Sequence, residues 1–174
     1  MIKFIYALFF LFLSGPAATE VSFARLINEH SFAKDRFFGG LEINLKLSQG
    51  VPYKIGFLED PVSLIIDFNK VKIDEIDPQK FNHSKNIKFI NFEELDTKWS
   101  RLSVQLKEYW DIESTEMRIN PEDGSAIISV MLKSISKNVF KSKNANIENL
   151  LKSKKSKVNE NSSGTKNSEF VVVL

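Results

Sequence analysis

Leu41-Glu42-Ile43-Asn44-Leu45-Lys46-Leu47-Ser48 is the stretch that decides the fold. Its apolar residues alternate one for one with polar residues, and a period of two predicts a β-strand with one buried face. The same alternation returns at 62–68, 101–107 and 126–132. We therefore predict an all-β fold whose core contains Ile43, Leu45, Leu47, Leu64, Ile66, Leu102, Val104, Leu106, Ile128 and Val130.

Turn-forming sequences lie between these strands. Three segments have the composition of tight turns: Gln49-Gly50-Val51-Pro52, Glu59-Asp60-Pro61 and Asn120-Pro121-Glu122-Asp123-Gly124. Between Ile112 and Ile119 the apolar residues change from even to odd positions. Since one extra residue in a strand produces that change of phase, we predict a β-bulge there.

The remaining strands are less regular. We expect the segment 69–86, which is polar and contains Pro78, to be an irregular crossover with one helical turn. Weaker alternation predicts further strands at 21–27, 53–58 and 87–92.

The two halves of this pattern resemble each other. Each half has a strand, an aromatic residue, a second strand, a proline turn and a third strand. We predict two small sheets, one from each half, which pack their apolar faces together. The alternative is a simple meander of hairpins, which also looks self-similar. The matching elements are 41–48, Tyr53, Pro61 and 62–68 in the first half, and 101–107, Tyr109, Trp110, Pro121 and 125–132 in the second.

Residues 1–18 have the layout of a secretory signal peptide. Lys3 precedes an apolar run from Phe4 to Leu13, and small residues follow as far as Ala18. A membrane-spanning helix needs about 20 apolar residues, so an uncleaved anchor is the weaker alternative. Cleavage is expected after Ala17 or Ala18, with a site after Ala24 as a further candidate. We therefore expect a protein exported from the cytoplasm, with no membrane span after cleavage.

The positive charge of the chain lies in a tail that follows the predicted domain at 21–136. Residues 137–169 contain eight Lys and three Glu, a net charge of +5, whereas the whole chain carries +2. The rest is therefore mildly acidic, which argues against a nucleic-acid partner. We predict a flexible linker over 137–169, because this composition buries little apolar surface. The spacing of its few apolar residues, from Val139 to Leu151, is also compatible with a short docked helix.

The final residues, Phe170-Val171-Val172-Val173-Leu174, are apolar and β-branched. Such a run is typical of a strand that is buried on both faces of a parallel sheet. We interpret 170–174 as the first strand of a second domain that is missing from this chain. The alternative is that these residues fold back and add an edge strand to the sandwich.

The chain has no recognisable catalytic centre. It has no Cys, and its two histidines, His30 and His83, stand alone in polar surroundings. A catalytic zinc site needs about three protein ligands, usually with His among them. We therefore expect no catalytic residue, no metal and no cofactor in this chain.

Recognition of a surface ligand is the remaining role. Aromatic rings stack on sugars, and Arg or Lys pairs with carboxylates. The alternative for each aromatic candidate is plain core packing, and for Arg101 it is a pair with an acidic neighbour. The candidate ligand-binding residues are Tyr53, Trp99, Arg101, Tyr109 and Trp110.

Five segments carry a resemblance to a known family: Leu47-Ser48-Gln49-Gly50-Val51-Pro52-Tyr53, the Pro61 turn, Ile65-Ile66-Asp67-Phe68, Trp99-Ser100-Arg101-Leu102 and Ala126-Ile127-Ile128-Ser129-Val130. Together they resemble the AMIN domain. The similarity spans about residues 21–140, is most specific over 47–68, and is greatest to the version found in alphaproteobacterial N-acetylmuramoyl-L-alanine amidases. Members of this family often carry an Arg just before the hydrophobic strand that ends in Asp-Phe. In this chain the corresponding residue is Ser63, so any role of that Arg in the relatives does not carry over.

The resemblance implies a periplasmic domain that localises a cell-wall hydrolase by binding peptidoglycan. Cell-division or other envelope proteins are possible further partners. In these amidases a linker leads to a zinc-dependent catalytic domain whose first strand resembles Phe170–Leu174. Zinc is therefore expected in that missing domain. One alternative is a stand-alone periplasmic AMIN protein that assists assembly of an envelope complex such as a secretin. Another is an exported β-domain that binds a protein through a sheet edge.

The amidase interpretation predicts what the gene encodes after codon 174. We expect a sequence like Asp-Pro-Gly-His, in frame or after a single frameshift, because that motif follows the corresponding strand in the resembling amidases. Sequencing the DNA downstream of Leu174 is the measurement. A stop codon with no catalytic remnant nearby would contradict the interpretation and leave the stand-alone alternative.

Overall fold

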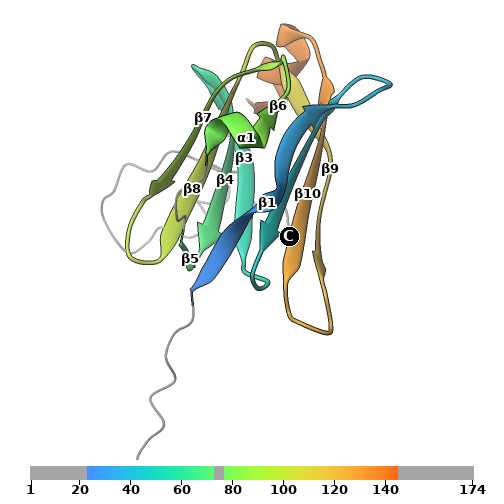
Figure 1. Cartoon of the computed structure of the whole chain (residues 1–174). Coiled ribbons are helices and arrows are strands. Elements are labelled where there is room, and N and C mark those ends of the chain that lie inside the picture. Colours follow the sequence, from blue (N-terminus) through green and yellow to red (C-terminus); the bar gives the residue numbers. More distant parts are fainter. Residues whose placement is uncertain (1–22, 73–76, 145–174) are drawn as a thin grey trace, which may run out of the picture.

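Two β-sheets packed face to face make up the part of the chain that the computed structural model describes, residues 23–72 and 77–144 (Figure 1). The first sheet has the strand order β5-β1-β2-β10-β9, and β6 also pairs with β1. The second has the order β3-β4-β8-β7. The strands of the first sheet are β1 (Ala24–Asp35), β2 (Leu41–Leu47), β5 (Val71–Lys72), β6 (Asn82–His83), β9 (Trp110–Ile119) and β10 (Ala126–Ser134), and those of the second are β3 (Tyr53–Glu59), β4 (Val62–Asn69), β7 (Ile87–Glu94) and β8 (Trp99–Leu106).

The predicted all-β class and strand phases are confirmed. All ten residues predicted for the core are buried, and they belong to one apolar cluster between the sheets. The weaker strands are present as β1, β3 and β7. β1 runs on to Asp35, well beyond its predicted end at residue 27, because its polar middle bulges away from β2 without ending the strand.

The internal repeat is present in the topology, but each half does not form its own sheet as predicted. If β1-β2-β3-β4 is matched to β7-β8-β9-β10, the order β1-β2-β10-β9 becomes β7-β8-β4-β3, which is the second sheet. Each half therefore gives its first two strands to one sheet and its last two to the other. Strand alternation reports which face is buried but not which strand is the neighbour, which explains the error.

The predicted β-bulge is also confirmed. In the ladder between β9 and β10, Ile112 pairs with Leu132 and Ser114 pairs with Met131, which leaves Glu113 as the extra residue. Apolar residues before and after the bulge consequently face the same core, although they differ in parity.

Two short helices complete the described structure. The crossover between β4 and β7 contains α1 (Pro78–Phe81), the single helical turn that was predicted. A second helix covers residues 137–144, and Ser136 caps it through its side-chain oxygen, which accepts from the backbone N–H of Val139. Phe140 of this helix is 2% exposed and lies against the rings of Phe57 and Tyr109. The docked helix is therefore present where the tail begins.

The predicted signal peptide at 1–18, most of the predicted linker and the segment 170–174 lie outside the described residues. Within 23–72 and 77–144, the chain has no helix with the length and apolar character needed to cross a membrane.

Val104 tests the strand phase. Its side chain is fully buried between the sheets, so Val104→Asp places an unpaired carboxylate in the core. We expect a loss of about 3 kcal/mol or more in the free energy of unfolding, measured by urea denaturation. Gln105→Asp is the matched control because residue 105 points to the outer face, opposite Ser63, where an acid remains close to water. Equal stability of the two variants would contradict the assigned phase.

Candidate functional site

A row of alternating charge crosses the outer face of the second sheet. Lys54 on β3 lies opposite Asp67 on β4, which lies opposite Arg101 on β8, which lies opposite Glu93 on β7. Directly opposed residues point to the same face of a sheet, so the four side chains form a line of signs +, −, +, −. The two inner members of this line, Asp67 and Arg101, make the tightest contact.

Arg101 and Asp67 form a two-pronged ion pair. Arg101 Nε lies 2.7 Å from Asp67 Oδ1, and Arg101 Nη2 lies 3.0 Å from Asp67 Oδ2. Asp67 is only 5% exposed, and the hydrogen bonds from Arg101 to it raise the pKa of that guanidinium above its usual value. Arg101 thus compensates a buried carboxylate, the acidic partner named above as the alternative to ligand binding.

Trp99 lies on the same outer face as Arg101, two residues earlier on β8. Its ring is partly exposed, and the ammonium group of Lys54 lies 4.5 Å from the ring centroid. The structure thus places two of the five predicted ligand-binding residues, Trp99 and Arg101, on one surface.

The other three predicted ligand-binding residues lie elsewhere. The hydroxyl group of Tyr53 lies 2.9 Å from that of Thr115, and this contact joins the second sheet to the first. Tyr109 packs against Phe140, and Trp110 is 3% exposed inside the core. The indole N–H of Trp110 is buried without a hydrogen-bond partner among the described residues. These three side chains mainly hold the sandwich together.

A depression beside β1 is a feature that sequence reasoning missed. In the ladder of β1 with β2, Ile27 pairs with Lys46 and Phe32 pairs with Asn44, so residues 28–31 face Leu45 alone. The Ser31 hydroxyl stabilises this wide bulge, since it donates to the Ile27 carbonyl at 2.7 Å and accepts from the Lys46 backbone N–H at 2.9 Å. The depression has a volume of about 790 Å³ and is lined by Asn28, Glu29, Ser31, Phe32, Lys34, Asp77, Lys80 and His83.

The lining combines apolar, cationic and acidic groups. The Lys34 ammonium lies 4.5 Å from the centroid of the Phe32 ring, and Lys80 approaches from α1. Asp77 caps that helix by accepting from the Gln79 backbone N–H at 2.9 Å, which fixes the position of its first turn. Pockets of about 300–1,000 Å³ with a few convergent polar groups are typical ligand sites.

The sequence contains only a weak indication of this depression. The polar run Asn28-Glu29-His30-Ser31 interrupts the alternation of apolar and polar residues in β1. Such an interruption favours the prediction that the strand ends there rather than that it contains a bulge. The neighbouring α1 reaches β1 through the parallel pairing of β6, and such long-range pairing leaves no local pattern. Among the described residues, no group of three or more His, Cys, Asp or Glu side chains is arranged to hold a metal ion.

The fold and these surfaces define an all-β binding module. Comparison with family models makes the assignment specific: the model described as the AMIN domain matches residues 35–130, more than half of the chain. This chain therefore belongs to the AMIN domain family. AMIN domains bind peptidoglycan and are typically periplasmic. A comparison with curated proteins found no match.

The ion pair between Arg101 and Asp67 generates a prediction. Arg101→Ala leaves a carboxylate buried without its main partner, so we expect a loss of about 3 kcal/mol in the free energy of unfolding. Adding Asp67→Ala should recover part of that loss, and urea denaturation of the four chains measures both effects. Arg118→Ala is the matched control because Arg118 pairs with Glu116 at an exposed position, where little change is expected. Additive effects of Arg101→Ala and Asp67→Ala would contradict the coupling.

Proposed function

We propose that this domain binds peptidoglycan as the targeting module of an N-acetylmuramoyl-L-alanine amidase, and that its own residues cut no bond. The observation that carries the proposal is the AMIN match across β2 to β10, since AMIN domains bind this polymer. The resemblance of Phe170–Leu174 to the first strand of an amidase catalytic domain supports the enzyme named.

We further propose that the polymer is bound in the depression beside β1. Peptidoglycan offers sugar rings, amides and carboxylates. Phe32 supplies an apolar face for a sugar, and the ammonium group of Lys80 suits the carboxylates of the stem peptide. The ammonium group of Lys34 also lines the depression, but it lies 3.4 Å from the Glu42 carboxylate. On the other sheet, the Arg101 guanidinium already holds a buried carboxylate, so it is less suited to a second one. If the polymer instead binds the outer face of the second sheet, Trp99 is the residue predicted to contact it.

Charge reversal in the depression tests this site. We expect Lys80→Glu to weaken co-sedimentation with purified peptidoglycan about tenfold, because a charge-assisted contact is replaced by repulsion. Lys88→Glu, the same charge change at an exposed position of β7, is the matched control and should bind like the unchanged chain. Weakened binding by Trp99→Ala with no effect of Lys80→Glu would move the site to the outer face of the second sheet.

The same assay tests the wider proposal. The chain should release no soluble muropeptides, with or without added zinc. Binding through the lysines of residues 137–169 alone would be lost at moderate salt and would be insensitive to Lys80→Glu. A chain that stays in the supernatant at both low and moderate salt would contradict the targeting function.

A further inference from the structure

The hairpin between β1 and β2 ends in two fully exposed aromatic side chains. Phe37 and Phe38 are 94% and 96% exposed, and their rings meet edge to face with centroids 4.9 Å apart. The next most exposed large apolar residue among those described, Phe89, is 60% exposed. Figure 1 shows this hairpin projecting from the sandwich at the end that also carries the helix over residues 137–144. Apolar tips of this kind usually contact a partner.

Backbone hydrogen bonds and glycine geometry define the conformation of the hairpin tip, residues 36–40. The Gly39 backbone N–H donates to the Arg36 carbonyl at 3.2 Å, and the Arg36 N–H donates to the Gly40 carbonyl at 3.0 Å. Gly39 and Gly40 have φ angles of 87° and 99°, and a Cβ at residue 40 would lie 2.7 Å from the Leu132 carbonyl oxygen. Only glycine therefore lets the tip approach β10 so closely.

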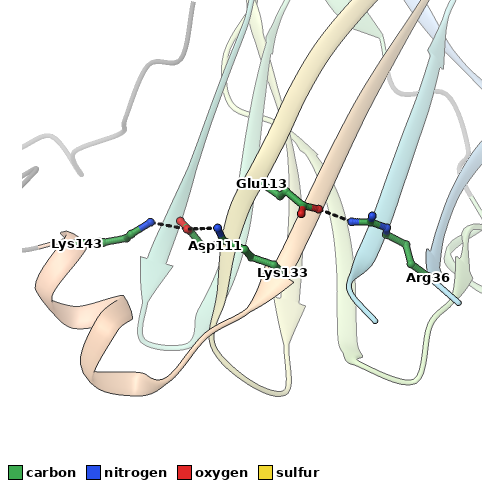
Figure 2. Close-up of polar contacts among 5 residues, drawn as sticks. All are labelled: Arg36, Asp111, Glu113, Lys133 and Lys143. Atoms are coloured by element: carbon green, nitrogen blue, oxygen red, sulfur yellow. Dashed lines mark hydrogen bonds and ion pairs between the residues drawn. The ribbon is translucent and has the colours of Figure 1, made fainter. Parts of the chain in front are cut away.

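Ionic contacts brace the base of the tip. The bulge of β9 presents Glu113 to the Arg36 guanidinium, and the two form an ion pair (Figure 2). On the other side, the Asp35 carboxylate accepts hydrogen bonds from Ser84 and Asn86. Burial raises the pKa of the Asp35 carboxyl group. The hydrogen bonds from Ser84, Asn86 and the Lys85 backbone N–H together lower it by more, so the pKa lies below its usual value. The fold thus keeps two phenylalanines in water by specific contacts.

Cationic side chains surround the same end of the first sheet. Lys133 and Lys143 both lie by the Asp111 carboxylate, with Nζ to Oδ2 distances of 3.9 and 2.5 Å (Figure 2). The helix over residues 137–144 adds two further exposed lysines, Lys137 and Lys141. The acidic turn between β3 and β4 belongs to the other sheet.

We propose that the hairpin tip inserts Phe37 and Phe38 into the surface of an anionic phospholipid bilayer. Aromatic side chains enter the boundary between headgroups and acyl chains, and lysines near that surface are attracted to anionic headgroups. Neither contribution alone gives stable binding, and together they form a weak, reversible anchor. The domain is then held against a membrane while its other surfaces stay free.

The area of the tip favours a bilayer over a protein pocket. Two phenylalanines present about 150–250 Å² each, whereas a stable protein interface buries about 800 Å² per partner. The residues beside the tip are charged, so they do not extend the apolar area as an interface core would. A lipid surface needs no such extension, because it takes the protruding groups alone.

A fluorescent label at the tip tests the proposal in the whole chain. The chain has no Cys, so Phe38→Cys carries a single polarity-sensitive label, and Glu122→Cys carries the same label at the turn between β9 and β10. Residues 4–13 are themselves an apolar run, so sedimentation with vesicles would not isolate the contribution of the tip. A label reports only its own surroundings.

With vesicles of phosphatidylglycerol and phosphatidylethanolamine, we expect the label at residue 38 to shift to the blue and to lose most of its quenching by iodide. The label at residue 122 should remain quenched. Adding Phe37→Ser to the labelled chain should weaken insertion about tenfold, since one buried phenylalanine is removed, whereas Phe89→Ser is the matched control without effect.

Three results would overturn the proposal. One is equal quenching of the label at residue 38 with and without vesicles. The second is an equal blue shift in vesicles of phosphatidylcholine alone, which would remove the role of the lysines. The third is a label that stays in water with lipid but becomes buried when a membrane-free fraction of envelope proteins is added, which would assign the tip to a protein partner.

Discussion

The structure depends on the pairing of β2 with β10 and of β4 with β8. Each pair joins a strand of the first half of the chain to a strand of the second half and forms the centre of one sheet. Neither half has a complete sheet of its own, so the apolar faces meet only when both central pairs exist. The edge strands, the two helices and the hairpin tip are all positioned by these two pairs.

The sequence predicts the inward face of each strand but not the strand order. Burial repeats every second residue, so Ile43 and Val104 are identifiable from their neighbours alone, and so is the bulge at Glu113. Strand order depends on contacts between residues far apart in the chain, which leave no local pattern. The wide bulge at 28–31 is not predictable in the same way, because a polar run within a strand has the same pattern as the end of that strand.

The same distinction applies to the candidate sites. Aromatic residues were predicted as ligand contacts from their chemistry, yet Trp110 lies in the core and Tyr53 links the sheets, because a large ring is also the best filler of a core. The depression beside β1 is built from β1, α1 and β6, and only the folded chain brings them together. The hairpin tip differs from these sites because it is one continuous segment, Phe37-Phe38-Gly39-Gly40, that can be read directly in the sequence. The structure adds that both phenylalanine side chains are exposed to solvent.

The exchange of strands between the halves also affects how the chain can be made and moved. β2 ends at Leu47 and its partner begins at Ala126, so no stable sheet exists until nearly the whole domain has been synthesised. Chains dominated by such distant pairings fold slowly. A polypeptide that passes through a narrow translocation channel has to stay extended on the way. In any exported chain, a topology of this kind delays folding until the last strand has emerged on the far side.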